Sequence, residues 1–296
     1  MKRIALTTAF LLMVALVAAA HADRGSIPFD PYVQIFEPSQ RAIIGWNGEE
    51  EVMILSTDLS ASQPTTILEV LPLPSEPQVR ESNVQVFADL TQIINDHLNY
   101  MVLREDSRGQ GAGAAPAPAA EVTFHERIGA HDITVFKVLD QEGFVAWVED
   151  YLREQGATNL TVPDALNAVV AEYLADGFDW FVFDVVSLTD ETKTHQAIEY
   201  RFATDYLYYP LRITRTETGW TSVDLIVLTP DPLTDFPGYP KDEVNLMHDL
   251  ITVNNAELEA VTNEFEGLFA PDADLTLRIW QITGDLPSFT EDLLAR

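Results

Sequence analysis

Acidic residues lie among aromatic ones near position 180, and this is where the sequence offers carboxylate chemistry. Asp179 precedes Trp180, and Asp184 follows within the same apolar run. Sugar-binding clefts and glycosidases combine acids with aromatic rings, because one carboxyl group donates a proton while a second attacks or activates water. Asp179 and Asp184 are therefore candidate catalytic residues of a secreted carboxylate-dependent hydrolase. The competing interpretation is a helix end followed by a strand whose aromatic residues enter the core.

A second group of acids lies in a proline-rich stretch. Asp231, Asp235 and Asp242 lie in or just after residues 229–240, which include four prolines. Calcium binds several oxygen ligands at flexible spacing, so these acids are candidate metal ligands in a calcium-stabilised module. The spacing lacks the alternating acids, central glycine and terminal glutamate of a calcium-binding loop. We therefore expect no cofactor, with calcium as the alternative.

Three tyrosines precede Pro210 and are candidates for a binding surface. Tyr206, Tyr208 and Tyr209 could present rings that pack against a partner while their hydroxyl groups stay in water. The competing interpretation is that they are ordinary strand residues, since tyrosine is common in strands.

Several other catalytic chemistries lack support in the sequence. The chain has no cysteine, which excludes disulfides, thiolate catalysis and cysteine-based metal centres. His125 and His131 are six residues apart, whereas a helical zinc-protease motif needs histidines four apart. We find neither a Gly-x-Ser-x-Gly elbow nor a phosphate-binding glycine loop. These observations favour a protein that is not an enzyme.

The chain carries 47 acidic against 17 basic residues, a formal net charge of −30. Phosphate backbones and anionic lipid surfaces repel such a chain, so nucleic acid is not an expected partner. Hydrophobic residues make up 47% of the sequence, which is too many for a disordered acidic segment. The composition predicts a folded protein with a substantial core.

The first 22 residues resemble a signal peptide. Lys2 and Arg3 precede an apolar run over residues 4–20, and Ala20-His21-Ala22 provides a small-x-small cleavage site. The alternative is a retained anchor, because the apolar run approaches the length that spans a bilayer. We expect cleavage and an exported, soluble, periplasmic or extracellular product without stable membrane insertion.

Composition then divides the remaining chain into three segments. Residues 23–105 form a β-rich part with one helix over 84–100, and Asn47-Gly48 predicts a hairpin between strands 41–46 and 52–56. Residues 106–121 are rich in Gly, Ala and Pro and predict a flexible linker or loop. Residues 122–296 form an α+β part.

The pattern of the third segment predicts most of its elements. Strands are expected at 122–127, 133–139, 180–188, 198–203, 211–215, 223–228 and 275–282, and helices at 143–155, 163–175, 257–269 and the C-terminus. The helices are grouped rather than alternating with strands. The expected fold class is therefore α+β, a mostly antiparallel sheet with helices grouped on one side.

Three ordered stretches carry a family resemblance: DRGSIP at 23–28, LPLPSEP at 71–77 and YLYYPLRI at 206–213. Together they resemble a family of exported prokaryotic proteins, the domain of unknown function twenty-three thirty, over nearly the whole mature chain. Many members have cysteines soon after the signal, but residues 23–29 contain none. The resemblance implies location and architecture rather than a mechanism.

Two functional hypotheses follow. The first is an exported, non-enzymatic protein that binds an envelope or extracellular component, favoured by the clustered tyrosines and proline-rich loops. The second is the carboxylate-dependent hydrolase, acting on glycans. The calcium-stabilised module is a third possibility.

Overall fold

The computed structural model describes residues 24–33, 35–100, 121–139, 141–240 and 243–296. The expected signal peptide lies outside the described residues, as does the linker up to residue 120. The strands are β1 (Gly25–Pro28), β2 (Ile35–Trp46), β3 (Glu50–Ala61), β4 (Thr65–Leu73), β5 (Gln78–Ser82), β6 (Glu121–Ile128), β7 (His131–Lys137), β8 (Trp180–Leu188), β9 (Lys193–Thr194), β10 (Ala197–Ala203), β11 (Leu207–Tyr209), β12 (Trp220–Thr229), β13 (Val244–Leu246), β14 (Ile251–Asn254), β15 (Asp274–Asp285) and β16 (Leu293–Ala295). The α-helices are α1 (Gln85–Tyr100), α2 (Gln141–Glu154), α3 (Asp164–Ala175) and α4 (Asn255–Glu259), and the 3₁₀ helices are η1 (Arg212–Thr216) and η2 (Leu286–Ser288).

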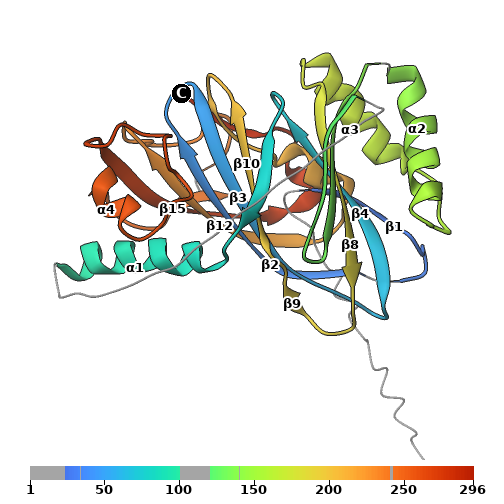
Figure 1. Cartoon of the computed structure of the whole chain (residues 1–296), viewed down its shortest axis with the longest axis horizontal. Helices are drawn as coiled ribbons and strands as arrows, with labels where there is room; N and C mark the ends of the chain where they lie inside the picture. The colour runs from blue at the N-terminus through green and yellow to red at the C-terminus, as the bar shows by residue number, and fades with distance from the viewer. Residues whose placement is uncertain (1–23, 34, 101–120, 140, 241–242) are drawn as a thin grey trace, which may run out of the picture.

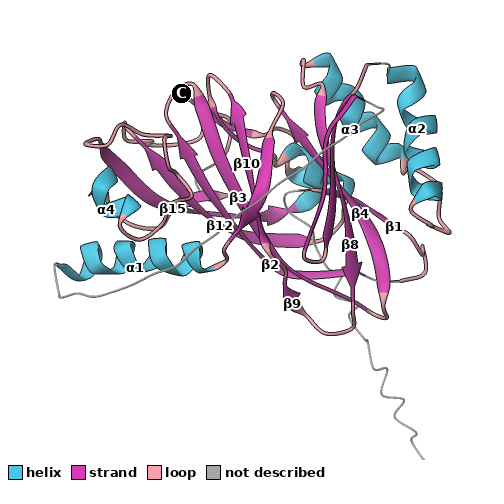
Figure 2. Ribbon diagram, viewed as in Figure 1, coloured by secondary structure: helices cyan, strands magenta, loops and turns pink. Residues whose placement is uncertain are grey.

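These strands form two large sheets, which confirms an α+β fold built mostly from antiparallel strands (Figure 2). The five-stranded sheet has the order β1-β4-β8-β7-β6. The nine-stranded sheet follows β13-β15-β12-β2-β3-β10-β5, with β14 and β9 pairing beside this path. Within it, β2 and β12 pair in parallel. Both sheets contain strands from before and after the expected linker, so the two parts of the chain fold as one body.

The hairpin at Asn47-Gly48 is confirmed. Trp46 pairs with Glu51 across the turn, and Gly48 has a φ of 101°, which side-chain-bearing residues rarely adopt. The Asn47 side-chain oxygen accepts hydrogen bonds from the backbone N–H groups of Glu49 and Glu50, at 2.9 and 2.8 Å. The turn chemistry is local, which is why the sequence pattern predicts it.

Both faces of the nine-stranded sheet are covered. Along β2, Ala42 and Ile44 belong to the large core cluster, which also includes residues of the five-stranded sheet, whereas Ile43 lies in a second cluster with the buried side of α1. This alternation is the period of two expected of a strand with an apolar layer on each face. The central strands therefore consist largely of apolar residues.

The sequence pattern predicts helices grouped on one side, and the structure differs from this prediction. Apolar residues of α1 and α4 pack in the second core cluster, whereas those of α2 and α3 pack in the large cluster with β7 and β8. Figure 1 shows the two pairs at opposite ends of the molecule. Two sheets leave more than one apolar face to cover, and the order of the helices along the chain does not indicate which one each helix covers.

Three local predictions were wrong. Residues 212–216 form η1 instead of a strand, α4 ends at Glu259 instead of continuing to 269, and the C-terminus contains β16 instead of a helix. Each segment is short, so contacts with distant parts of the chain determine its conformation more strongly than its own residue pattern does. Within the described part of the chain, none of the helices has the length and apolar character needed to cross a membrane.

Gly45 lies where β2 meets the loop after α4, and its missing side chain is needed there. A Cβ at this position would lie 2.8 Å from Phe265 Cδ1 and 2.9 Å from Leu268 Cδ2. We expect Gly45→Ala to lower the free energy of unfolding by about 1–3 kcal/mol through overpacking, measured by urea denaturation. In a Phe265→Leu background the cost should shrink, since the two positions share one contact. Equal costs in both backgrounds would contradict this explanation.

Candidate functional site

Ionisable side chains from several strands meet in a buried group that we call the Arg24 cluster: Arg24, Glu69, His131, Asp184 and Tyr200. Glu69 on β4 and Asp184 on β8 are register partners, which places their side chains on the same face of the five-stranded sheet. All five are at most 4% exposed. A charged residue this deep in a protein needs a partner, and the cluster supplies partners of both signs.

Arg24 connects the two acids of this cluster. Its guanidinium donates to Glu69 Oε2, to Asp184 Oδ2 at 3.0 Å and to the Tyr200 hydroxyl at 3.4 Å. His131 Nδ1 lies 2.7 Å from the same Asp184 oxygen, and the His131 ring meets that of His195 edge to face, with 5.5 Å between centroids. These contacts join the start of the described chain to β4, β7, β8 and β10.

The charges of the Arg24 cluster set its protonation states. Burial alone would raise the pKa of Asp184, but the charges and hydrogen bonds of His131 and Arg24 outweigh it and lower this pKa. Burial alone would lower the pKa of His131, but the neighbouring Asp184 carboxylate raises it above its ordinary value. When His131 is protonated, the cluster pairs two cations with the carboxyl groups of Glu69 and Asp184.

Asp179 and Asp184, the candidate catalytic acids, are not brought together. Asp184 is 2% exposed and bound within the Arg24 cluster, whereas Asp179 forms a surface ion pair with Lys137 at 2.8 Å. A pair of glycosidase carboxyl groups must face one substrate from two sides. The competing interpretation, an acid at a strand start followed by aromatic core residues, describes this segment.

The candidate tyrosine surface does not form. Tyr208 and Tyr209 are completely buried, and Tyr206 is half-buried. Strand β11 pairs with β16, and the Tyr208 hydroxyl donates to the backbone oxygen of Pro72 at 3.0 Å. The alternation of tyrosines indicated a strand but could not show that a C-terminal strand would cover it.

Two buried acids hold this pair of strands, which we call the β11–β16 ribbon. Glu51, fully buried at the start of β3, accepts a hydrogen bond from the backbone N–H of Tyr208 at 2.7 Å. Asp292, just before β16, accepts from the Tyr173 hydroxyl at 2.7 Å and from the backbone N–H of Arg212 at 2.9 Å. Burial raises the pKa of Glu51 well above its ordinary value and that of Asp292 to about 6.

The ribbon forms one wall of an open cavity of about 300 Å³ that we call the Trp46 groove. The hairpin tip and the loop after β12 form its other walls. The lining residues are Trp46, Asn47, Gly48, Leu207, Thr229, Pro230, Asp231, Pro232, Leu233, Thr234, Asp235, Pro237, Ala295 and Arg296. Two of the candidate metal ligands, Asp231 and Asp235, therefore line one cavity, and Asp242 lies outside the described residues. Across the residues that the structure describes, no group of three His, Asp or Glu side chains is arranged to hold a metal ion.

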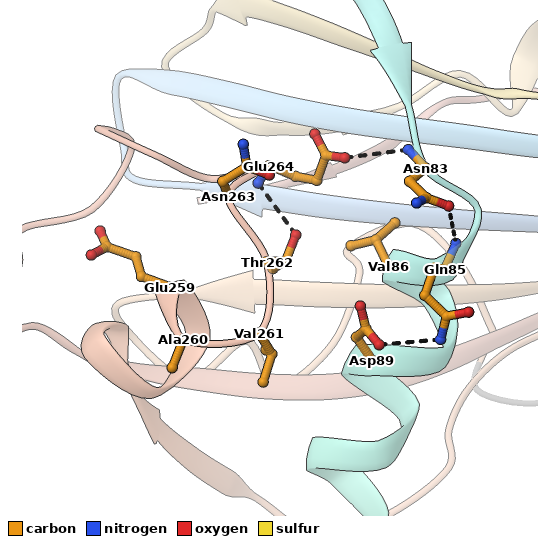
Figure 3. A pocket seen from close by; sticks show the side chains of 10 residues that line it. All are labelled: Asn83, Gln85, Val86, Asp89, Glu259, Ala260, Val261, Thr262, Asn263 and Glu264. Atoms are coloured by element: carbon orange, nitrogen blue, oxygen red, sulfur yellow. Dashed lines mark hydrogen bonds between the residues drawn. The ribbon is translucent and has the colours of Figure 1, made fainter. Parts of the chain in front are cut away.

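A second cavity of about 270 Å³ lies between the start of α1 and the loop after α4 (Figure 3). Glu264 lies at its edge, where it accepts hydrogen bonds from the Ser82 hydroxyl at 2.9 Å and the Asn83 backbone N–H at 3.3 Å. It also pairs with Arg80, which in turn binds Glu199 through two hydrogen bonds. Burial raises the pKa of Glu199 to about 7 even though Arg80 lowers it. These contacts attach the loop after α4 to β5 and to the residue Asn83 before α1, which is a structural role.

The sequence pattern missed the Arg24 cluster, although it contains a signal for it. Glu69 and Asp184 each lie inside an apolar run, and an acid within a buried strand requires a buried partner. The partners come from Arg24 and His131, which are distant in sequence. The signal therefore indicates that partners exist without identifying them.

The comparisons with known proteins add a family and a distant structural likeness. No curated protein matches the chain significantly. The crystal structure of a mutated baculovirus P35 after caspase cleavage is similar over 87% of this chain and 97% of that one, with 7% sequence identity and a TM-score of 0.42. The family model described as uncharacterized protein conserved in bacteria (DUF2330) matches residues 18–243. With three quarters of its length matched, the chain belongs to the DUF2330 family of bacterial proteins.

Proposed function

We propose that this chain is an exported, non-enzymatic binding protein that holds a segment of an envelope or extracellular glycan in the Trp46 groove. The observation that carries the proposal is the lining of that groove. It combines an indole ring and prolines with two exposed carboxylates and one guanidinium. Binding sites for small polar ligands pair apolar surface with a few polar groups that fix orientation.

Trp46 is suited to stack against the apolar face of a sugar ring. It is half-buried, and its indole Nε1 donates to the backbone oxygen of Thr204 at 3.3 Å, which fixes the ring against the hairpin. A ring held in place loses little conformational entropy when a ligand binds. Asp231, Asp235 and Thr234 provide exposed oxygen atoms in the same cavity for sugar hydroxyl groups.

The N-terminal sequence pattern supports export. The apolar run over residues 4–20 and the Ala20-His21-Ala22 site predict a cut before Asp23. Arg24, the next residue, is buried in its cluster. The proposed cleavage would leave that cluster intact.

Substitution of Trp46 tests the proposal. We expect the protein to bind soluble oligosaccharides of N-acetylglucosamine or of glucose in calorimetry, and Trp46→Ala to weaken binding roughly tenfold or more through loss of stacking. The matched control is Trp220→Ala. Trp220 is 62% exposed and lies at the opposite end of β12 from Thr229, which lines the groove. Equal affinity of both variants, or no binding by the unmodified protein, would contradict the proposal. Release of reducing sugar would indicate the hydrolase instead.

A further inference from the structure

We propose that the β11–β16 ribbon is a pH-dependent wall of the Trp46 groove, docked in acid and progressively released as pH rises. The inference concerns the regulation of the proposed site, and only its link to ligand binding rests on the proposed function. It stands on the position of two buried acids at the ribbon's attachment to the rest of the fold.

The first attachment is Glu51. Its side chain is completely buried, and one carboxyl oxygen binds the Tyr208 backbone N–H while the other, Oε1, has no hydrogen-bond partner in the described part of the chain. Glu51 is also the register partner of Trp46, so the two side chains share a face beside the groove. An ionised carboxylate with a bare oxygen in the interior is costly, whereas a neutral carboxyl group is tolerated. The docked ribbon therefore favours neutral Glu51.

The second attachment is Asp292, which is 6% exposed. One of its oxygens accepts both the Tyr173 hydroxyl and the Arg212 backbone N–H, and the other lies 3.6 Å from Arg212 Nη2. The other terminal guanidinium nitrogen, Nη1, is bound to Asp176 at 2.6 Å. Arg212 is thus shared between two acids, and burial still raises the pKa of Asp292 to about 6.

The groups that face these acids come from every element packed against them. Tyr206 and Tyr208 face both acids from β11 and the turn before it, and Tyr239 faces Asp292 from the loop after β12. Burial raises the pKa of all three tyrosines above 10, so they stay neutral near pH 7. Charged groups nearby include the Asp205–Arg296 pair, at 2.9 Å, Asp176 with Arg212, and Glu291 and Glu243 beside Tyr239. Glu51 and Asp292 are the two completely or almost completely buried acids that attach the ribbon.

The direction of the effect follows from linkage. A carboxyl group with a raised pKa in the docked state binds its proton more tightly there than in the released state, so acid favours docking. For Asp292, a pKa of about 6 when docked against an ordinary value near 3.8 makes release about tenfold easier at about pH 8 than at about pH 5. Glu51 adds to this change in the same direction. Leu207, Ala295 and Arg296 line the groove from the ribbon, so release removes that wall.

Hydrogen exchange without ligand tests the inference directly. The Tyr208 and Arg212 amides report the two attachments, and the Leu225 amide in central β12 reports the sheet. After correction for intrinsic exchange, we expect the protection of the two attachment amides to fall at least tenfold from about pH 5 to about pH 8. Both should stay less protected than Leu225 throughout, which shows that they exchange by local release and not by global unfolding. Glu51→Gln and Asp292→Asn keep the acceptor oxygens but cannot ionise, so the attachment protection of the double variant should not change over this range.

Glu199→Gln serves as the matched control, because Glu199 is a buried acid with a raised pKa that lies in the Arg80 network instead of at the ribbon. It should retain the unmodified protein's dependence. Unchanged attachment protection in the unmodified protein, or a double variant that keeps the dependence, would overturn the inference. Oligosaccharide affinity should weaken over the same range and do so less in the double variant. If exchange behaves as expected and no oligosaccharide binds at any pH, the proposed function fails and the ribbon switch stands.

Discussion

Replacing Arg24 with methionine is expected to lower the free energy of unfolding by about 3–5 kcal/mol. Arg24 is the shared partner of Glu69 and Asp184, both 2% exposed. Methionine fills similar space but leaves two buried acids with only His131 as a cationic partner. Removing one member of a buried ionic group is costly because the remaining charges stay desolvated.

Urea unfolding of the protein measures this effect, and Arg127→Met is its control. Arg127 also pairs with an acid, Asp132, at 2.8 Å, but its side chain is 74% exposed. An exposed pair contributes about 0–1 kcal/mol, so this variant should unfold almost like the parent. The Arg24→Met loss should shrink when Glu69→Gln and Asp184→Asn are added, since neutral amides need no counter-charge. Similar stabilities for Arg24→Met and Arg127→Met would refute the role given to the cluster.

The second large effect is a loss of stability as pH rises from about 5 to about 8. Burial raises the pKa values of Glu51, Glu199 and Asp292, the last two to about 7 and about 6. Between the unfolded and folded pKa values the folded state holds protons that the unfolded state has lost, so the free energy of unfolding falls with rising pH. Glu199 and Asp292 together account for a loss on the order of 4 kcal/mol over this range.

His131 and Asp184 act at different ends of the pH scale. The raised pKa of His131 gives stability that is complete below its unfolded pKa and is lost as pH rises through the folded one, in the same direction as the acids. The lowered pKa of Asp184 gives stability that is lost only as pH falls through its folded pKa, below about 3.8. Unfolding curves at several pH values in high salt test this, because salt screens buried groups less than surface repulsion. Glu199→Gln and Asp292→Asn should flatten the slope, and stability that rises toward pH 8 would be incompatible with these pKa shifts.

Local patterns predicted much of the fold. The hairpin at Asn47-Gly48, α1 and β8 follow from turn chemistry and periodicity within a few residues, and the structure contains all three. Local patterns could not predict which helices cover each face of the two sheets. It depends on pairings such as β2 with β12, whose residues are far apart in sequence.

The residues of the candidate site are harder to predict from the sequence than the elements of the fold. The sequence makes Asp231 and Asp235 candidate metal ligands because they are acidic. The structure places them in one cavity with Trp46, and no local motif connects Trp46 with these two acids. Tyr208 was expected at the surface because its own segment cannot reveal that β16 covers it. Whether a polar residue is buried depends on its distant neighbours, and a single sequence contains no direct record of them.

The parallel pairing of β2 with β12 also determines when this chain can fold. Gly45 on β2 pairs with Leu228, so the centre of the nine-stranded sheet cannot close until most of the polypeptide has been synthesised. Pairings between segments this distant carry a large loop-closure cost and slow folding. A newly made chain therefore spends a long time with its sheets incomplete. That delay is compatible with the proposed export, because it would give an export machinery time to engage the chain before the native structure forms.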